Sequence, residues 1–152
     1  MPSRRHEIKM TDGELRAFLR EQRVMQCATI GPRGWPHVVG LWYVPDGVEL
    51  RGWTYAKSQK SRNLERDPRA TVEIEDGVEY HELRGVMMEC HVEVERDVDR
   101  VAEYGLALVD RYAGGAPEAR EAFRQQARKR VGLRFVPARI VSWDHRKLGG
   151  VY

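Results

Sequence analysis

Alternating apolar and polar residues, the pattern of half-buried strands, occur through much of the chain. The clearest example runs from Arg69 to Asp76, where Val72 and Ile74 alternate with polar neighbours. Other segments are rich in strand-forming residues and are separated by Gly, Pro and Asp turn signals. They are Val24 to Ile30, Trp35 to Val44, Val48 to Thr54, Tyr80 to Glu95 and Arg130 to Trp143. The pattern therefore predicts six strands, with Gly85 marking a bulge or a barrel corner in the long one.

Helical periodicity occurs in four places. Thr11 and Glu14 form a capping-box pattern, and an apolar stripe at helical spacing follows it. A short helix is predicted from Ser58 to Arg66, ahead of Asp67-Pro68. Two further helices are predicted over 97–112 and 118–129, separated by a Gly-Gly-Ala-Pro break.

Hairpin-connected strands with a few helices indicate an α+β fold, in which a six-stranded antiparallel sheet closes into a small barrel with flanking helices. Closure would remove the edge strands. We expect one domain over 11–148, a flexible N-terminal tail over 1–10 and a C-terminal tail over 149–152, because no linker or internal repeat divides the chain.

Composition narrows the class of protein. The 152 residues are 41% hydrophobic and 32% charged, which is typical of a soluble globular domain. No apolar run approaches the ~20 residues of a membrane span. The basic N-terminus has no apolar segment behind it, so it does not resemble a secretory signal, and we expect a cytoplasmic protein. Cys27 and Cys90 lie apart in apolar strand patterns, which favours buried thiols over a metal or redox pair.

The net charge of +3 is spread among interleaved cations and carboxylates. That distribution does not predict a nucleic-acid face and suits a small anionic ligand better. No P-loop, nucleophile elbow or metal-ligand spacing occurs. Glu73 and Glu75 could form a carboxylate pair, but alternation puts both on one outward face, and we interpret them as solvated.

One segment combines several phosphate-binding groups. From Thr54 to Leu64, a predicted strand passes into a predicted helix, and the junction carries hydroxyls, an amide and cations. A helix N-terminus adds unpaired backbone N–H groups and a positive dipole end. On local composition alone, a solvated helix face is the favoured interpretation of these residues. The segment is our candidate for a bound cofactor's phosphate.

Four landmarks in order give the chain a family resemblance. They are Ala28 to His37, Leu41-Trp42-Tyr43 with Asp46-Gly47, Thr54 to Leu64 with Arg66 to Arg69, and Lys129-Arg130-Val131 to Leu148. In these the chain resembles the split β-barrel flavin-binding superfamily related to pyridoxamine 5′-phosphate oxidase, and within it the members that use the deazaflavin coenzyme F420. The substrate-binding residues of the oxidase itself are not recognisable, so pyridoxamine phosphate oxidation is not predicted.

The resemblance implies a homodimer with a cofactor at each side of the subunit interface. It assigns the phosphate to the third landmark, at Thr54, Lys57, Ser58, Lys60, Arg62 and Asn63. It assigns the ring system to the first two strands, near Thr29, His37, Val38 and Val39. The implied activity is hydride transfer between reduced F420 and an unsaturated or conjugated small molecule. FMN is the alternative cofactor, and a non-catalytic flavin-, haem- or lipid-binding protein is the alternative function. No catalytic residue, metal site, nucleic acid or membrane contact is implied.

Overall fold

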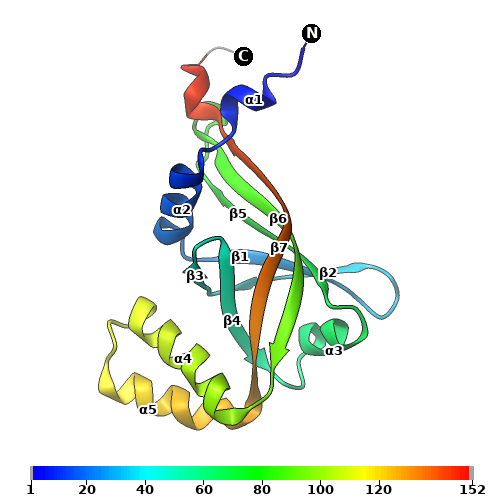
Figure 1. The fold of residues 1–152 in the computed structure, drawn as a ribbon, viewed down its shortest axis with the longest axis vertical. Helices are drawn as coiled ribbons and strands as arrows, with labels where there is room; N and C mark the ends of the chain where they lie inside the picture. Colours follow the sequence, from blue (N-terminus) through cyan, green and yellow to red (C-terminus); the bar gives the residue numbers. More distant parts are fainter. Residues whose placement is uncertain (1, 151–152) are drawn as a thin grey trace.

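The computed structural model describes residues 2–150 as one curled antiparallel sheet with helices packed around it (Figure 1). The strands are β1 (Met25–Ile30), β2 (Pro36–Leu41), β3 (Val44–Asp46), β4 (Glu49–Tyr55), β5 (Arg69–Asp76), β6 (Arg84–Glu95) and β7 (Arg130–Asp144). The α-helices are α1 (Arg5–Ile8), α2 (Asp12–Glu21), α3 (Gln59–Arg66), α4 (Val98–Tyr112) and α5 (Pro117–Gln126), with 3₁₀ turns η1 (Tyr80–Glu82), η2 (Ala127–Lys129) and η3 (His145–Leu148). The α+β prediction is confirmed.

The strand order in the sheet is β2-β1-β5-β6-β7-β4-β3. Helix α3 contacts both β1 and β4, although three strands separate these two in the sheet. The sheet must therefore curl around α3, as a half-barrel does. The predicted closure does not occur within the described residues, because β2 pairs only with β1 and β3 only with β4. Both remain edge strands.

The number of strands was predicted wrongly, because the sheet has seven and not six. The expected strand from Trp35 to Val44 is interrupted at Trp42 and Tyr43. The Tyr43 ring is fully buried, and its hydroxyl donates a 2.8 Å hydrogen bond to the carbonyl of Leu19. This anchor turns the chain inward, and the residues that follow form β3 in a hairpin with β4.

The long strand β6 differs from its prediction at two points. Residues 80–82 form the 3₁₀ turn η1, so the strand begins at Arg84. The register shift lies between Glu89 and Cys90 and not at Gly85. Gly85 instead lies beneath an indole ring, since a Cβ there would meet Trp143 Cζ2 at 2.6 Å.

Two apolar clusters hold the fold together. The larger fills the concave side of the sheet and includes Phe18, Leu19, Leu50 and Phe135. The capping box at Thr11 and Glu14 that begins α2 is confirmed, and it positions the α2 residues of this core. In the smaller cluster α4 and α5 cover Trp53 of β4. Figure 1 shows these two helices together at one end of the molecule and α3 at the opposite side of the sheet.

The segment predicted as an N-terminal tail carries helix α1, which contacts β7 and η3, and ends at the buried Met10. Whether this segment is flexible stays a prediction. Of the predicted C-terminal tail, Tyr152 and its neighbour Val151 lie outside the described residues. Among residues 2–150, no helix is both long and apolar enough to cross a membrane.

Candidate functional site

The junction of β4 and α3 has the geometry that the sequence predicts for a helix N-terminus. Ser58 is the N-cap of α3, and its hydroxyl accepts a 3.1 Å hydrogen bond from the backbone N–H of Ser61. The Thr54 hydroxyl at the end of β4 donates to the same Ser58 oxygen at 3.2 Å. The backbone N–H groups of Gln59 and Lys60 lie in the first turn, so the helix has no carbonyl one turn earlier to which they could donate. An anion at this end of α3 would meet both N–H groups and the positive end of the helix dipole.

Two cations near this end of α3 are withdrawn from solvent. Lys60 is only 8% exposed, and burial lowers its pKa below the ordinary value. Arg130, at the start of β7, also has a pKa lowered by burial, and its charge lowers the pKa of Lys60 further. Neither forms an ion pair with a carboxylate among the described residues. A buried cation without a counter-ion is destabilised, so this pair would be stabilised by a bound anion.

Arg130 is held in place by aromatic rings. Its guanidinium lies 3.8 Å from the centre of the Tyr55 ring and 4.8 Å from that of Trp53. One of its terminal nitrogens donates a 2.8 Å hydrogen bond to the side chain of Gln126. Arg130 lies in the last of the four sequence landmarks, but it was not predicted to be a binding residue. The sequence carried no signal for this role, because only the pairing of β4 with β7 brings Arg130 opposite Tyr55.

Asn63 and Thr29 bind each other. The Asn63 side-chain amide donates a 3.0 Å hydrogen bond to the Thr29 hydroxyl, and both residues are almost completely buried. Gln59 donates to the Asn63 oxygen at 2.8 Å. The pair thus joins α3 to β1 and fixes the helix against the sheet. Contact of either side chain with a cofactor stays a prediction.

The predicted ring-side residues of β2 lie on both faces of the sheet. Because side chains alternate along a strand, His37 and Val39 share the face of their register partners Thr29 and Cys27. Val38 lies on the other face and is 55% exposed. What these residues share is their position on an edge strand, whose free side presents unpaired backbone N–H and C=O groups.

The remaining predicted phosphate contacts, Lys57 and Arg62, are exposed on either side of the N-terminal turn of α3. Neither side chain forms a hydrogen bond or an ion pair with another described residue. The structure therefore gathers Thr54, Ser58 and Lys60 at one end of α3. The side chains of Lys57 and Arg62 are long enough to reach the same surface.

Unsatisfied polar atoms mark two regions of the molecule. Among residues 2–150, five buried side-chain N or O atoms have no hydrogen-bond partner. Three of them are Ser61 Oγ in α3, Arg130 Nε near the N-terminus of α3, and His37 Nδ1 on β2 opposite Thr29. The other two are Glu73 Oε1 and His145 Nδ1. Buried polar atoms are normally paired, so such clusters point to places where a ligand completes the structure.

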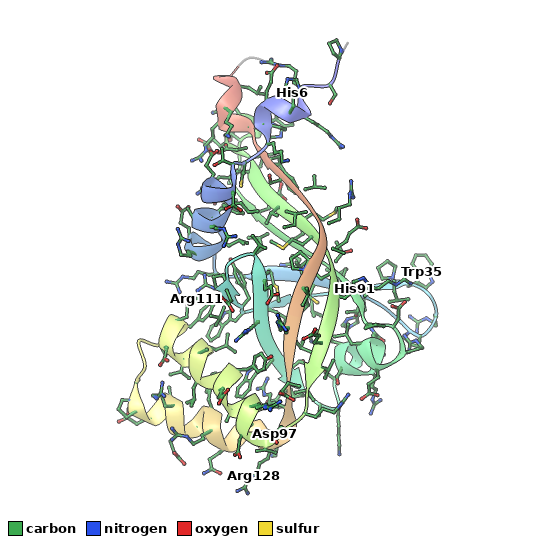
Figure 2. All side chains as sticks on the ribbon, viewed as in Figure 1. His6, Trp35, His91, Asp97, Arg111 and Arg128 are labelled. Atoms are coloured by element: carbon green, nitrogen blue, oxygen red, sulfur yellow. The ribbon has the colours of Figure 1, made fainter. Side chains whose placement is uncertain are left out.

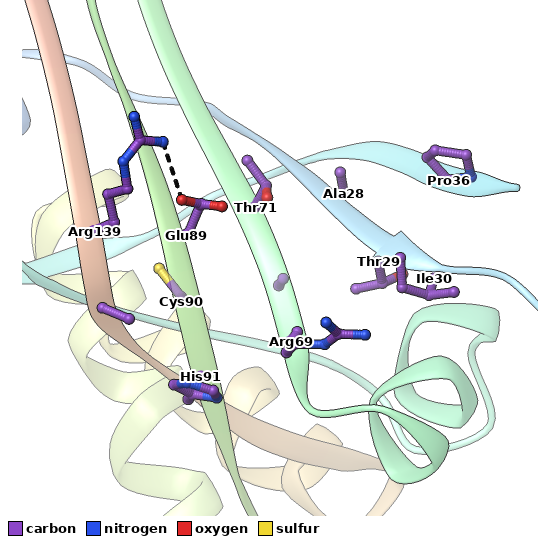
Figure 3. A pocket seen from close by; sticks show the side chains of 12 residues that line it. Ala28, Thr29, Ile30, Pro36, Arg69, Thr71, Glu89, Cys90, His91 and Arg139 are labelled. Atoms are coloured by element: carbon purple, nitrogen blue, oxygen red, sulfur yellow. Dashed lines mark hydrogen bonds and ion pairs between the residues drawn. The ribbon is translucent and has the colours of Figure 1, made fainter. Parts of the chain in front are cut away.

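A cavity of about 480 Å³ opens on the outer face of the sheet beside the ring-side residues (Figure 3). Ala28, Thr29 and Pro36 line one end of it. At the other end Arg139 donates a 3.1 Å hydrogen bond to Glu89 across β6 and β7. Among residues 2–150, no group of three or more His, Cys, Asp and Glu side chains could hold a metal ion.

Comparison with known proteins places this geometry in a family. The family model described as pyridoxamine 5′-phosphate oxidase matches residues 11–144. The chain is similar over 99% of its length to the conserved hypothetical protein Rv2991 from Mycobacterium tuberculosis, with 41% sequence identity, a TM-score of 0.89 and coverage of 95% of that chain. No curated protein matches significantly.

Two further solved structures share the fold. One is described as an F420 reductase, with 25% identity, a TM-score of 0.64 and coverage of 82% of this chain and 93% of that one. The other is HutZ, the haem storage protein from Vibrio cholerae, with 18% identity, a TM-score of 0.69 and coverage of 86% and 93%. At that identity the second likeness concerns the fold alone.

Proposed function

Because this chain belongs to the pyridoxamine 5′-phosphate oxidase family, we propose that it is an oxidoreductase that binds a phosphate-bearing flavin-type cofactor, with the deazaflavin F420 as the first candidate. The observation that carries the proposal is a pair of cations, the buried Lys60 and the half-buried Arg130, without a carboxylate partner among the described residues. A phosphate there would gain charge-assisted hydrogen bonds and would supply the missing counter-ion.

The phosphate would lie at the N-terminus of α3. The Ser58 side chain holds the first turn in place through its bond to the Ser61 N–H, which leaves the N–H groups of Gln59 and Lys60 for the ligand. The unpartnered Ser61 hydroxyl and Arg130 Nε are further donors at this end of the helix. The donor set is therefore cations, hydroxyls and backbone N–H groups, which is the chemistry that phosphate requires.

The ring system would lie along the free edge of β2. Backbone groups of an edge strand can bond the polar edge of a flat heterocycle without any particular side chain. This explains why His37, Val38 and Val39 can serve the same ligand although their side chains occupy different faces. When bound, the cofactor supplies the hydride chemistry, and the chain binds it, orients it and excludes water. The acceptor would be an unsaturated or conjugated small molecule.

The two candidate cofactors, F420 and FMN, differ in their negative charge. F420 carries an anionic glutamate tail beyond its phosphate, whereas FMN ends at the phosphate. The exposed Lys57 and Arg62 beside the phosphate site, with Arg33 on the β1–β2 hairpin, offer positive charge for such a tail. We therefore favour F420 over FMN. The likeness to the F420 reductase supports the same choice.

A homodimer would complete the site. The β1–β2 hairpin presents apolar side chains to solvent: Ile30 is 38% exposed, Val38 is 55% exposed and Trp35 is 74% exposed. Figure 2 shows Trp35 at the far end of this hairpin, projecting away from the sheet. Clustered exposed apolar residues mark interaction surfaces, and these lie beside the proposed ring position.

The test is a binding titration of the purified protein with F420 and, separately, with FMN. We expect F420 to bind at micromolar concentration or below, and Lys60→Met to weaken binding by about 10- to 100-fold, since a hydrogen bond to a charged group contributes about 1.5–3 kcal/mol. Lys129→Met is the matched control, because it removes the same charge from an exposed position nearby. FMN binding alone would change the cofactor. Binding of either cofactor without turnover would favour a carrier, and binding of neither would overturn the proposal.

A further inference from the structure

Helix α5 has no fully buried residue of its own, yet one of its faces reaches the start of β7. Phe123 of this helix stacks on Trp53 with ring centres 5.2 Å apart. Gln126, three positions later, accepts a 2.8 Å hydrogen bond from a terminal nitrogen of Arg130. Residues three apart lie on the same side of a helix, so one face of α5 holds both the aromatic ring and the cation. The docking of α5 therefore fixes the surroundings of Arg130.

Arg130 lies beside the junction of β4 and α3. It is the register partner of Tyr55, the last residue of β4. The backbone N–H of Ala56, the next residue, donates a 2.9 Å hydrogen bond to the carbonyl of Lys129. The start of β7 is thereby tied to the loop that enters α3. Lys60 in that helix is near enough for the Arg130 charge to lower its pKa.

The guanidinium of Arg130 has little freedom to turn. The centres of the Tyr55 and Trp53 rings lie 3.8 Å and 4.8 Å from its central carbon, and cation–π attraction holds a guanidinium against such rings. A guanidinium carries five N–H donors in one plane, so a bond to one of them sets the direction of the others. Gln126 makes that bond, and Arg130 Nε is left without a partner.

The acceptor at Gln126 is neutral, which leaves the charge of Arg130 uncompensated. Arg134, on the same face of β7, shows the contrast: its guanidinium pairs with Glu49 at 2.8 Å and with Glu93 at 2.9 Å, and its pKa is held above the ordinary value. Arg130 has no such carboxylate among the described residues, and partial burial lowers its pKa. A charge withdrawn from water without a counter-ion is destabilised, so Arg130 is the arginine of this strand that an external anion would stabilise.

On the basis of the proposed function, we infer that Gln126 is a positioning residue for the phosphate of the ligand, because it orients Arg130 without neutralising it. Gln126 does not itself touch the phosphate. A glutamate at this position, four residues before Arg130, would pair with the guanidinium and take the charge that the phosphate uses. A methionine would leave the guanidinium charged but would remove the bond that orients it. The residue type at position 126 thus sets how tightly an anion is held beside α3.

Inorganic phosphate is the probe for this inference, titrated into the full chain at constant ionic strength. Calorimetry gives the affinity, and the NMR signal of Arg130 Nε–H, identified by its loss in Arg130→Lys, reports on the guanidinium. We expect phosphate to bind at millimolar concentration, Gln126→Glu to weaken binding by about 10-fold or more, and Gln126→Met by about 3-fold. Gln125→Glu is the matched control, because it makes the same change at an exposed neighbour that bonds Glu121, and it should alter the affinity less than about 2-fold.

Stability separates positioning from a merely structural role. In urea unfolding, Gln126→Glu should be at least as stable as the original protein, because it supplies a counter-ion to Arg130, while its phosphate affinity falls. A structural role alone would make stability and affinity change in the same direction. Unchanged phosphate affinity in Gln126→Glu would overturn the inference, and so would an Arg130 Nε–H signal that does not shift with phosphate. If Gln126→Glu does not fold, unchanged affinity in Gln126→Met overturns it instead.

The outcome is distinguishable from failure of the proposed function. If phosphate binds and Gln126→Glu weakens it, but neither F420 nor FMN binds, the cofactor assignment fails and the role of Gln126 stands. If F420 binds and Gln126→Glu changes neither its affinity nor that of phosphate, the role of Gln126 fails and the cofactor assignment stands. If the original protein binds no phosphate, the inference is overturned whatever F420 does.

Discussion

The side-chain amide of Asn63 donates a 3.0 Å hydrogen bond to the hydroxyl of Thr29, and this buried contact joins α3 to β1. Removing one partner leaves the other buried and unsatisfied. We expect Asn63→Ala to lower the free energy of unfolding by about 1–3 kcal/mol. Thr29→Val should cost a similar amount, and the double variant should cost less than the sum, because the two residues share one interaction.

Urea unfolding of the four proteins in this cycle measures the coupling directly. Ser3→Ala, in the exposed N-terminal segment, is a control that should leave the midpoint unchanged. Fully additive effects of the two single substitutions would contradict the view that this contact anchors α3. The result matters for function because the same helix presents its N-terminus to the proposed cofactor.

Lys60 gives the protein a distinctive dependence of stability on pH. Its pKa is lowered in the folded state by burial, so the folded protein loses this proton at lower pH than the unfolded chain does. Between the folded pKa and the ordinary value of 10.5 the unfolded state holds more protons, and the free energy of unfolding therefore rises with pH. The contribution has a maximum slope of about 1.4 kcal/mol per pH unit.

Lys60→Met should remove this rise and should be at least as stable as the original protein at pH 7, because an unpaired cation is no longer buried. Parallel denaturation of both proteins between pH 7 and pH 10 isolates the effect from other groups, such as Tyr43, whose pKa is raised to about 12 by burial. If the difference in unfolding free energy between the two proteins stays constant with pH, the pKa of Lys60 is not lowered in the folded protein. Saturating phosphate-bearing ligand should also flatten the difference.

Substitution by alanine at two helical glycines should change the stability of the protein in opposite directions. At Gly105 of α4 a Cβ would meet the Trp53 ring at 2.4 Å, so Gly105→Ala should destabilise the protein by about 1–3 kcal/mol. Gly13 of α2 has nothing within 4 Å of that position, and Gly13→Ala should stabilise by about 0.5–1 kcal/mol. Thermal melting of both variants tests the packing of α4 on β4. A Gly105→Ala variant with unchanged stability would contradict this packing.

Val38 tests the proposed homodimer. Its side chain is 55% exposed on the β1–β2 hairpin, and Val38→Asp would place an unpaired charge in the interface that we propose. We expect light scattering to show a dimer for the original protein and a monomer for this variant. Val78→Asp makes the same change at an exposed loop valine and should leave the dimer intact. A monomeric original protein, or a Val38→Asp dimer, would count against the proposal.

The pattern of the sequence predicted most elements because each rests on a local cause. The capping box at Thr11, the Ser58 cap and the alternation along β5 all depend on near neighbours in the chain. The separate strand β3 could not be predicted this way. It exists because Tyr43 is pulled inward by a bond to Leu19, which lies in another element.

In the candidate site, too, the residues of one local segment could be predicted, and those brought in by long-range contacts could not. Thr54, Ser58 and Lys60 were predicted from one continuous segment, and the structure brings them together at one helix end. Arg130 could not be added from the sequence, because only the pairing of β4 with β7 brings it opposite Tyr55. Gln126 was missed for a similar reason, since the periodicity of its helix does not show that this helix packs on Trp53 and reaches Arg130.

The most direct test of the account is an amide NMR titration of the protein with F420. We predict that the backbone N–H signals of Gln59, Lys60 and Ser61 shift together and saturate, with Arg130 side-chain signals among those affected. The N-terminus of α2, at Gly13 and Glu14, is an internal control, since its capping box already satisfies that turn. Saturable shifts at α3 would support a cofactor phosphate held there. Shifts confined to other residues, or none at millimolar F420, would contradict the central claim.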